Sequence, residues 1–97
     1  MTDTSSDPSA ETIAEAVRAI DGVHGLHGGV FGEVATYLPG GRVPGVRIGD
    51  DGVEVHIVVR AGRPVLPVAN AVRTAVEAIT AGPTHVTVED LADINGD

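Results

Sequence analysis

The sequence contains no cysteine and no tryptophan, and its 97 residues include only two aromatic side chains, Phe31 and Tyr37. Without cysteine the chain forms no disulfide, has no thiolate nucleophile and binds no zinc ion or iron–sulfur cluster through sulfur, which suits a reducing cytoplasm. With so few aromatic rings, the core must consist of Val, Ile, Leu and Ala, and single-stranded nucleic acid finds no stacking platform.

Basic residues are also scarce, because 6 Lys and Arg stand against 14 Asp and Glu, for a formal net charge of −8. Such a chain repels a phosphate backbone, so we expect no nucleic-acid partner. The polar N-terminus lacks the positive start and apolar run of a signal peptide, and no stretch approaches the ~20 apolar residues of a membrane span. We therefore expect a cytoplasmic protein without direct membrane insertion.

The length of the chain fits a single domain with one modest core. We expect this domain to cover residues 9–91. Residues 1–8 are polar and acidic and predict a disordered N-terminal tail, and residues 92–97 predict an acidic C-terminal tail.

Two stretches have the apolar spacing of amphipathic helices. The first begins near Pro8 or Ser9 and ends at Gly22, and the second lies between Pro64 and Gly82. The predicted apolar stripes are Ile13, Ala16, Val17 and Ile20 in the first helix and Val68, Ala69, Val72, Val76 and Ile79 in the second.

The segment between these helices predicts short strands. The clearest is 53–60, where Val and Ile alternate with mostly polar residues, so that one face is buried. Asp50, Asp51 and Gly52 form a turn before it, which makes 46–48 its antiparallel hairpin partner. A weaker strand is expected at 33–38, and a last strand at 85–89 with Val86 and Val88 inward.

This order of helix, strands, helix and strand predicts an α+β fold, a two-layer sandwich with both helices on one face of a small, mostly antiparallel sheet. The other sheet face then stays open and presents a mixed polar surface, which is our candidate interaction site. Its residues are Arg47, Glu54, His56, Val58, Arg60, His85, Thr87 and Glu89.

Two other groups of residues are candidate binding sites. The glycine-rich stretch 25–32 could bind phosphate through its backbone amides, but no Gly-Lys-Ser/Thr follows it, and a structural turn is the usual use of such glycines. His24 and His27 are three residues apart and would need His56 or His85 and an acid such as Glu33 to complete a metal site.

The side chains that could act in catalysis lie in turns and near the termini, where water surrounds them. The carboxylates gather in turns and tails, as at Asp50, Asp51, Glu89 and Asp90, where water prevents the pKa shift that an acid/base pair needs. Serine occurs only at positions 5, 6 and 9, near the N-terminus. We therefore expect no catalytic site, and also no metal and no cofactor.

Several short motifs follow one another in a recognisable order. The first helix ends in Ile-Asp-Gly-Val at 20–23, and Gly-Leu-His-Gly-Gly follows at 25–29. After the alternating strand come a turn at 62–64, the Val-Ala-x-x-Val-x-x-x-Val helix at 68–76, and Val-Thr-Val-Glu-Asp at 86–90. In this order the chain resembles the alkaline shock protein family of bacterial envelope stress response proteins over about residues 10–91, and it departs from the family at 33–44.

The resemblance implies an abundant cytoplasmic protein that a small integral-membrane anchor holds near the membrane and that supports cell-envelope homeostasis. It implies action by self-association, as a homo-oligomer, and by anchor binding, with no catalytic residue to carry over. The high Ala, Gly, Val and Arg content suggests an actinobacterial source. Two alternatives stay open: an accessory domain for iron–sulfur cluster assembly, which the missing cysteine disfavours, and a His-based metal-binding protein.

Overall fold

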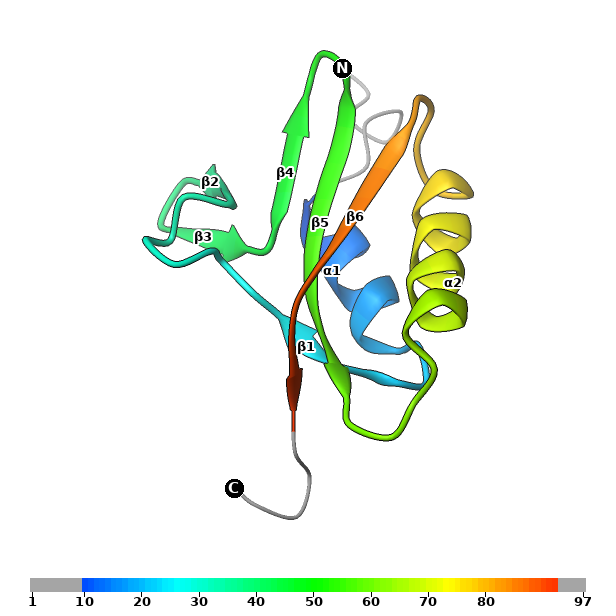
Figure 1. Cartoon of the computed structure of the whole chain (residues 1–97). Coiled ribbons are helices and arrows are strands. Elements are labelled where there is room, and N and C mark those ends of the chain that lie inside the picture. The colour runs from blue at the N-terminus through cyan, green and yellow to red at the C-terminus, as the bar shows by residue number, and fades with distance from the viewer. Residues whose placement is uncertain (1–9, 93–97) are drawn as a thin grey trace.

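The computed structural model describes residues 10–92 and has the predicted α+β order of helix, strands, helix and strand (Figure 1). The elements are α1 (Ala10–Arg18), β1 (Val23–Leu26), β2 (Ala35–Leu38), β3 (Gly41–Pro44), β4 (Val46–Gly49), β5 (Gly52–Arg60), α2 (Val65–Glu77) and β6 (Thr84–Ala92). The predicted tails lie outside the described residues except for Ala92, which pairs with Arg60 at the end of β6.

β5 is the central strand of a four-stranded sheet and carries the alternation that the sequence predicts. Its inward residues Val53, Val55, Ile57 and Val59 are each no more than 2% exposed. β4 pairs with it antiparallel through the predicted tight turn, and β1 also pairs antiparallel. β6 is parallel to β5, because α2 carries the chain back to the starting end of the sheet.

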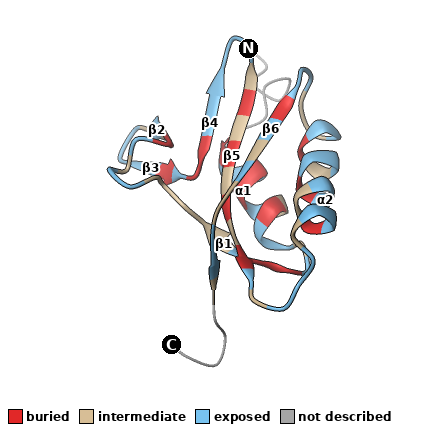
Figure 2. Ribbon diagram, in the orientation of Figure 1, coloured by how far each residue is buried: buried red, intermediate tan, exposed pale blue. Residues whose placement is uncertain are grey.

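Both helices cover the same face of this sheet, which confirms the two-layer arrangement (Figure 2). The buried stripes differ in part from the predicted ones. In α1 it is Ala14 that is fully buried, while Ala16 is half-buried, and α1 ends at Arg18, so that Ile20 packs from the following turn. In α2 the buried residues are Val68, Val72 and Val76, whereas the predicted Ala69 is half-buried and Ile79 packs against the core from beyond the end of the helix.

β4 and β1 lie end to end along one edge of β5 and meet at His56. The His56 N–H donates to the carbonyl of Gly45 (2.9 Å), and its carbonyl accepts from the N–H of His27 (2.9 Å). Gly45 has a φ of +86°, and a Cβ there would lie 2.7 Å from the Cβ of Leu26. The chain therefore leaves the sheet after Leu26 and returns at Gly45, and we call the excursion between them, residues 27–44, the arm.

The arm contains a hairpin that the sequence predicted only in part. The weaker strand expected at 33–38 forms β2, but its partner β3 was not predicted, and neither was β1. The hairpin lies beside β4 and apart from the main sheet (Figure 1). The hydroxyl of Thr36 donates to the carbonyl of Val46 (2.6 Å), and Val43 packs into the core, so the hairpin is tied to β4.

Candidate functional site

The predicted interaction residues lie on the sheet face opposite the helices. Glu54, His56 and Val58 alternate outward along β5. Across the sheet, Arg47 of β4 and His85 of β6 stand opposite Glu54. Thr87 stands opposite His56, and the side chain of Glu89 also contacts His56. Arg60 lies on the same side of β5 but at its far, exposed end. We call this surface the polar face.

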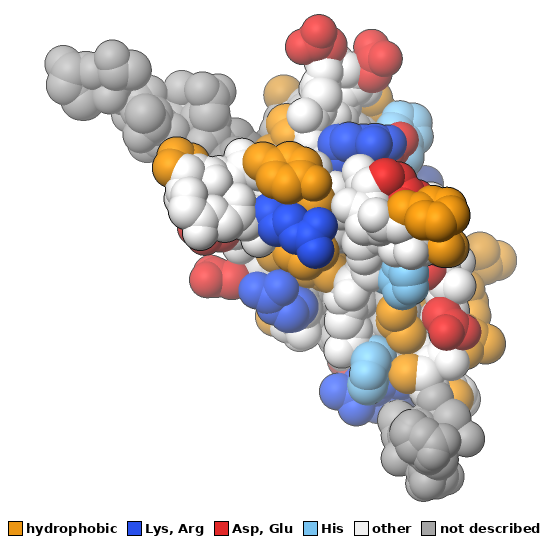
Figure 3. All heavy atoms as spheres, turned by 90° about the vertical axis from the view of Figure 1, so that its left-hand side faces the viewer, with side chains coloured by type: hydrophobic (Ala, Val, Ile, Leu, Met, Phe, Trp, Pro, Cys, Tyr) orange, Lys and Arg blue, Asp and Glu red, His pale blue; other side chains and the backbone are white. Residues whose placement is uncertain are grey.

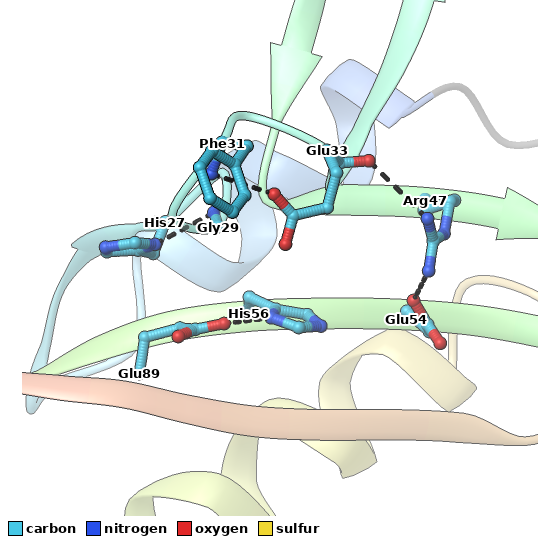
Figure 4. Close-up of polar contacts among 8 residues, drawn as sticks. All are labelled: His27, Gly29, Phe31, Glu33, Arg47, Glu54, His56 and Glu89. Atoms are coloured by element: carbon cyan, nitrogen blue, oxygen red, sulfur yellow. Dashed lines mark hydrogen bonds and ion pairs between the residues drawn. The ribbon is translucent and has the colours of Figure 1, made fainter.

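Charged side chains of the polar face are paired with one another. Arg47 Nη2 lies 2.5 Å from Glu54 Oε1, and His56 Nδ1 lies 2.5 Å from Glu89 Oε2 (Figure 4). A one-residue irregularity in the β5–β6 register at Glu89 places its carboxylate over His56, and both side chains are largely covered, at 22% and 16% exposed. A partner that covers this face therefore leaves few charges without a counterpart.

The first part of the arm, residues 28–34, is a compact loop organised by Glu33. The Phe31 N–H donates to Glu33 Oε1 (2.9 Å), and the Gly29 N–H donates to Nδ1 of His27 (2.9 Å) (Figure 4). The N–H groups of Gly32 and Val34 donate to carbonyls within the same loop. Gly29 has a φ of +88°, and a Cβ there would lie 2.6 Å from the Glu33 carboxyl carbon, so the carboxylate packs directly on the backbone.

These contacts favour the ionised form of Glu33. Hydrogen bonds from its own backbone N–H and from the Phe31 N–H hold the pKa of the carboxyl below its ordinary value of 4.5, and the nearby His56 and Arg47 add smaller contributions. The loop is thus built around an anion that the chain itself supplies.

This geometry argues against a phosphate site at residues 25–32. Gly25 and Leu26 belong to β1 and pair with β5. In the remaining loop, the amides of Gly29 and Phe31 already donate to side chains of the arm. A phosphate group would have to displace the Glu33 carboxylate from its place against Gly29.

The arm also exposes apolar side chains. Val30 is 80% exposed, Phe31 91% and Tyr37 72%, so the only two aromatic residues of the sequence both lie outside the core. Figure 3 shows the side of the molecule on which the arm lies, with apolar side chains among arginine, acidic and histidine side chains. We did not predict this feature. Phe31 stands next to Gly32 and outside any periodic apolar pattern, whereas Tyr37 lies in the predicted strand 33–38, two residues before Pro39.

The histidines do not converge. His24 is exposed at the register irregularity of β1, His27 bonds the loop backbone, His56 bonds Glu89, and His85 is exposed opposite Glu54. Within residues 10–92, no three His, Asp or Glu side chains stand close enough to hold a metal ion. An open hollow of about 370 Å³ lies between the β4–β5 turn and His85, beside the Arg47–Glu54 pair.

Compared with protein-family models, with curated proteins and with solved structures, the chain matches none of them. Neither α1 nor α2, the helices of the described part of the chain, is long and apolar enough to cross a membrane.

Proposed function

We propose that this chain is a non-enzymatic, cytoplasmic interaction domain that supports cell-envelope homeostasis by self-association and by binding a membrane-anchored partner protein. The observation that carries the proposal is the exposure of Phe31 and Tyr37 on the arm. The resemblance to the alkaline shock protein family supplies the setting, namely the envelope and the integral-membrane anchor.

Exposed aromatic side chains favour a binding role on energetic grounds. A phenylalanine that stays 91% exposed contributes nothing to the core but remains available for burial against a partner. Aromatic residues, phenylalanine included, are enriched in the cores of protein interfaces, and tyrosine is among the residues most often found as hot spots. Since Glu33 fixes the loop that carries Phe31, less conformational entropy is lost when a partner binds.

The polar groups of the site support binding rather than chemistry. Glu33 bonds the loop backbone, His56 bonds Glu89, and Arg47 bonds Glu54. Each of these groups has a structural task in holding the loop or the sheet face. The result is a preformed surface in which the exposed apolar residues of the arm stand beside the paired charges of the polar face.

The proposal is tested with a Phe31→Ser/Tyr37→Ser variant and with Leu66→Ser as the matched control, because Leu66 is 73% exposed on α2, away from the arm. Each purified protein is sedimented with membranes from the native host, with protease-treated membranes and with protein-free lipid vesicles. We expect the wild type and the control to bind untreated membranes only, and the arm variant to lose at least about tenfold in affinity.

Two outcomes contradict the proposal. Equal binding of the arm variant and the wild type removes the arm from the interface. Binding of the wild type to protein-free vesicles shows that lipid, and not an anchor protein, is the partner.

A further inference from the structure

β6 is a nine-residue edge strand. It pairs with β5 on one side, and within residues 10–92 no strand pairs with it on the other (Figure 1). The Pro83 carbonyl accepts from the Val53 N–H (3.0 Å), and in a parallel ladder alternate residues bond the neighbouring strand. The backbone groups of Thr84, Val86 and Val88 therefore point away from β5 and are available to another strand.

The first half of this edge has little to prevent strand addition. Residues 84–88 contain no acidic residue, no proline and no lysine, and four of the five are β-branched. Val86 and Val88 pack against the core but stay half-buried, whereas the inward residues of β5 are almost fully buried. A strand laid against β6 would cover the rest of these two valines.

We propose that two copies of this chain pair antiparallel along β6, across a twofold axis at Thr87, so that their sheets join into one sheet of eight strands. This inference rests on the proposed function and specifies how its self-association occurs. Across a twofold axis each contact between two different residues occurs twice, so one complementary pair of side chains contributes twice to the interface.

The side chains select this register. With the axis at Thr87, Val86 of one copy stands opposite Val88 of the other, and His85 stands opposite Glu89. Glu89 bonds His56 through Oε2, so Oε1 of Glu89 is available to the imidazole N–H of His85 from the second copy. An axis at Val86 would instead place His85 opposite Thr87 and Val88 opposite Thr84. This register would lose the contact of His85 with Glu89 and would pair Val88 with a threonine in place of a valine.

Edge pairing buries a small area, so the dimer is weak and forms at high protein concentration. Sedimentation from roughly 10 µM to 1 mM covers the corresponding range of Kd. Thr87→Lys places two like charges opposite each other at the axis, and we expect the dimer Kd to rise roughly tenfold. His85→Lys adds the same charge on the same exposed strand but opposite Glu89, and we expect an unchanged or lower Kd.

Disulfide trapping tests the register independently, since the native chain contains no cysteine. Residues facing each other in a non-hydrogen-bonded antiparallel pair have Cα atoms ~4.5 Å apart, within disulfide range, so Thr87→Cys should yield a covalent dimer on oxidation. Two copies of His85→Cys would be separated by four residues, about 14 Å along the strand, and should stay monomeric.

The outcomes separate this inference from the proposed function. If the wild type stays monomeric throughout, self-association itself fails and the inference fails with it. If the wild type associates but Thr87→Lys has no effect and Thr87→Cys does not cross-link, only the β6 interface is overturned. In that case a Val58→Asp/Arg60→Glu variant that dissociates the assembly would assign the contact to the polar face instead.

Discussion

Different interactions hold the two regions of the molecule. One region is the sandwich of β5 and the two helices, and the other is the arm at residues 27–44. Around β5, aliphatic side chains are buried from both layers, and the charged residues of the strand point away from the helices. The arm places its largest apolar residues in solvent and is held by backbone hydrogen bonds, by a carboxylate and by the few small residues that it buries.

This difference indicates a division of roles. The sandwich supplies the free energy of folding, because it contains most of the buried apolar area. The arm contributes less to stability but presents residues for binding. The two regions meet where Gly45 and His27 bond the backbone of His56. Substitutions in the sandwich should therefore lower stability, and substitutions of the exposed residues of the arm should weaken binding.

The largest effect is expected in the sandwich. Ile57→Ala removes three carbons from a side chain that is 0% exposed on the central strand, and the cavity should cost about 3 kcal/mol of unfolding free energy. Phe31→Ala removes a larger side chain from the arm and should change the unfolding free energy by no more than about 0.5 kcal/mol. Urea unfolding followed by circular dichroism measures both.

One result would contradict this division of roles between the sandwich and the arm. A loss of several kcal/mol in Phe31→Ala would show that the ring is buried in solution, and the division between the two regions would be wrong. Ile57→Ala should in turn leave membrane binding intact at temperatures where the variant stays folded.

The junction should give an effect of similar size, through backbone strain and steric conflict in place of a cavity. Gly45→Ala forces a Cβ into a left-handed residue, 2.7 Å from the Cβ of Leu26 and 3.1 Å from the carbonyl oxygen of His56, and should cost about 3 kcal/mol. Gly40→Ala has a similar φ of +84° but open space, and should cost about 1 kcal/mol. Gly41→Ala, with neither constraint, should be close to neutral.

These three alanine variants separate backbone strain from steric conflict, and thermal unfolding ranks them. An equal loss at Gly45 and Gly40 would mean that the chain crossing at Gly45 can widen without cost. The arm would then be only loosely joined to the sheet.

The sequence predicts the sandwich well because its signals are local. The alternation at 53–60 and the helical spacing at 68–76 are each complete within one element. β1 and β3 were missed because each has four residues and depends on a partner strand that is distant or itself weakly marked. The strand at 85–89 was found, but its extension to Ala92 depends on pairing with β5.

The candidate site was predicted as a face and not as a set of contacts. Alternation places Glu54, His56 and Val58 on one side, which is enough to define the polar face. The His56–Glu89 pair follows from a register irregularity in β6, and the Glu33 contact follows from the backbone of the loop. Neither has a periodic signal, so the sequence alone does not reveal them.

The smallest effect on stability, but the most specific, is expected at Glu33. Its pKa in the folded chain is lower than the ordinary 4.5, so the folded state favours the carboxylate. The stabilisation of the loop is therefore complete above pH 4.5 and is lost as the pH falls through the lowered pKa. The amide resonance of Phe31, which donates to this carboxylate, should shift with a midpoint below pH 4.5 in an NMR titration.

Glu33→Gln is the control for this titration, because an amide of the same shape does not ionise in this range. In that variant the Phe31 amide should no longer follow the pH, while the melting temperature changes by only a few degrees because the loop is exposed. A Phe31 midpoint above pH 4.5, or an unchanged titration in Glu33→Gln, would mean that another group organises the loop. Unaltered membrane binding by Glu33→Gln would further show that the charge on Glu33 is unnecessary for the arm to bind, since the variant retains Val30, Phe31 and Tyr37 and an amide oxygen that can accept the Phe31 N–H.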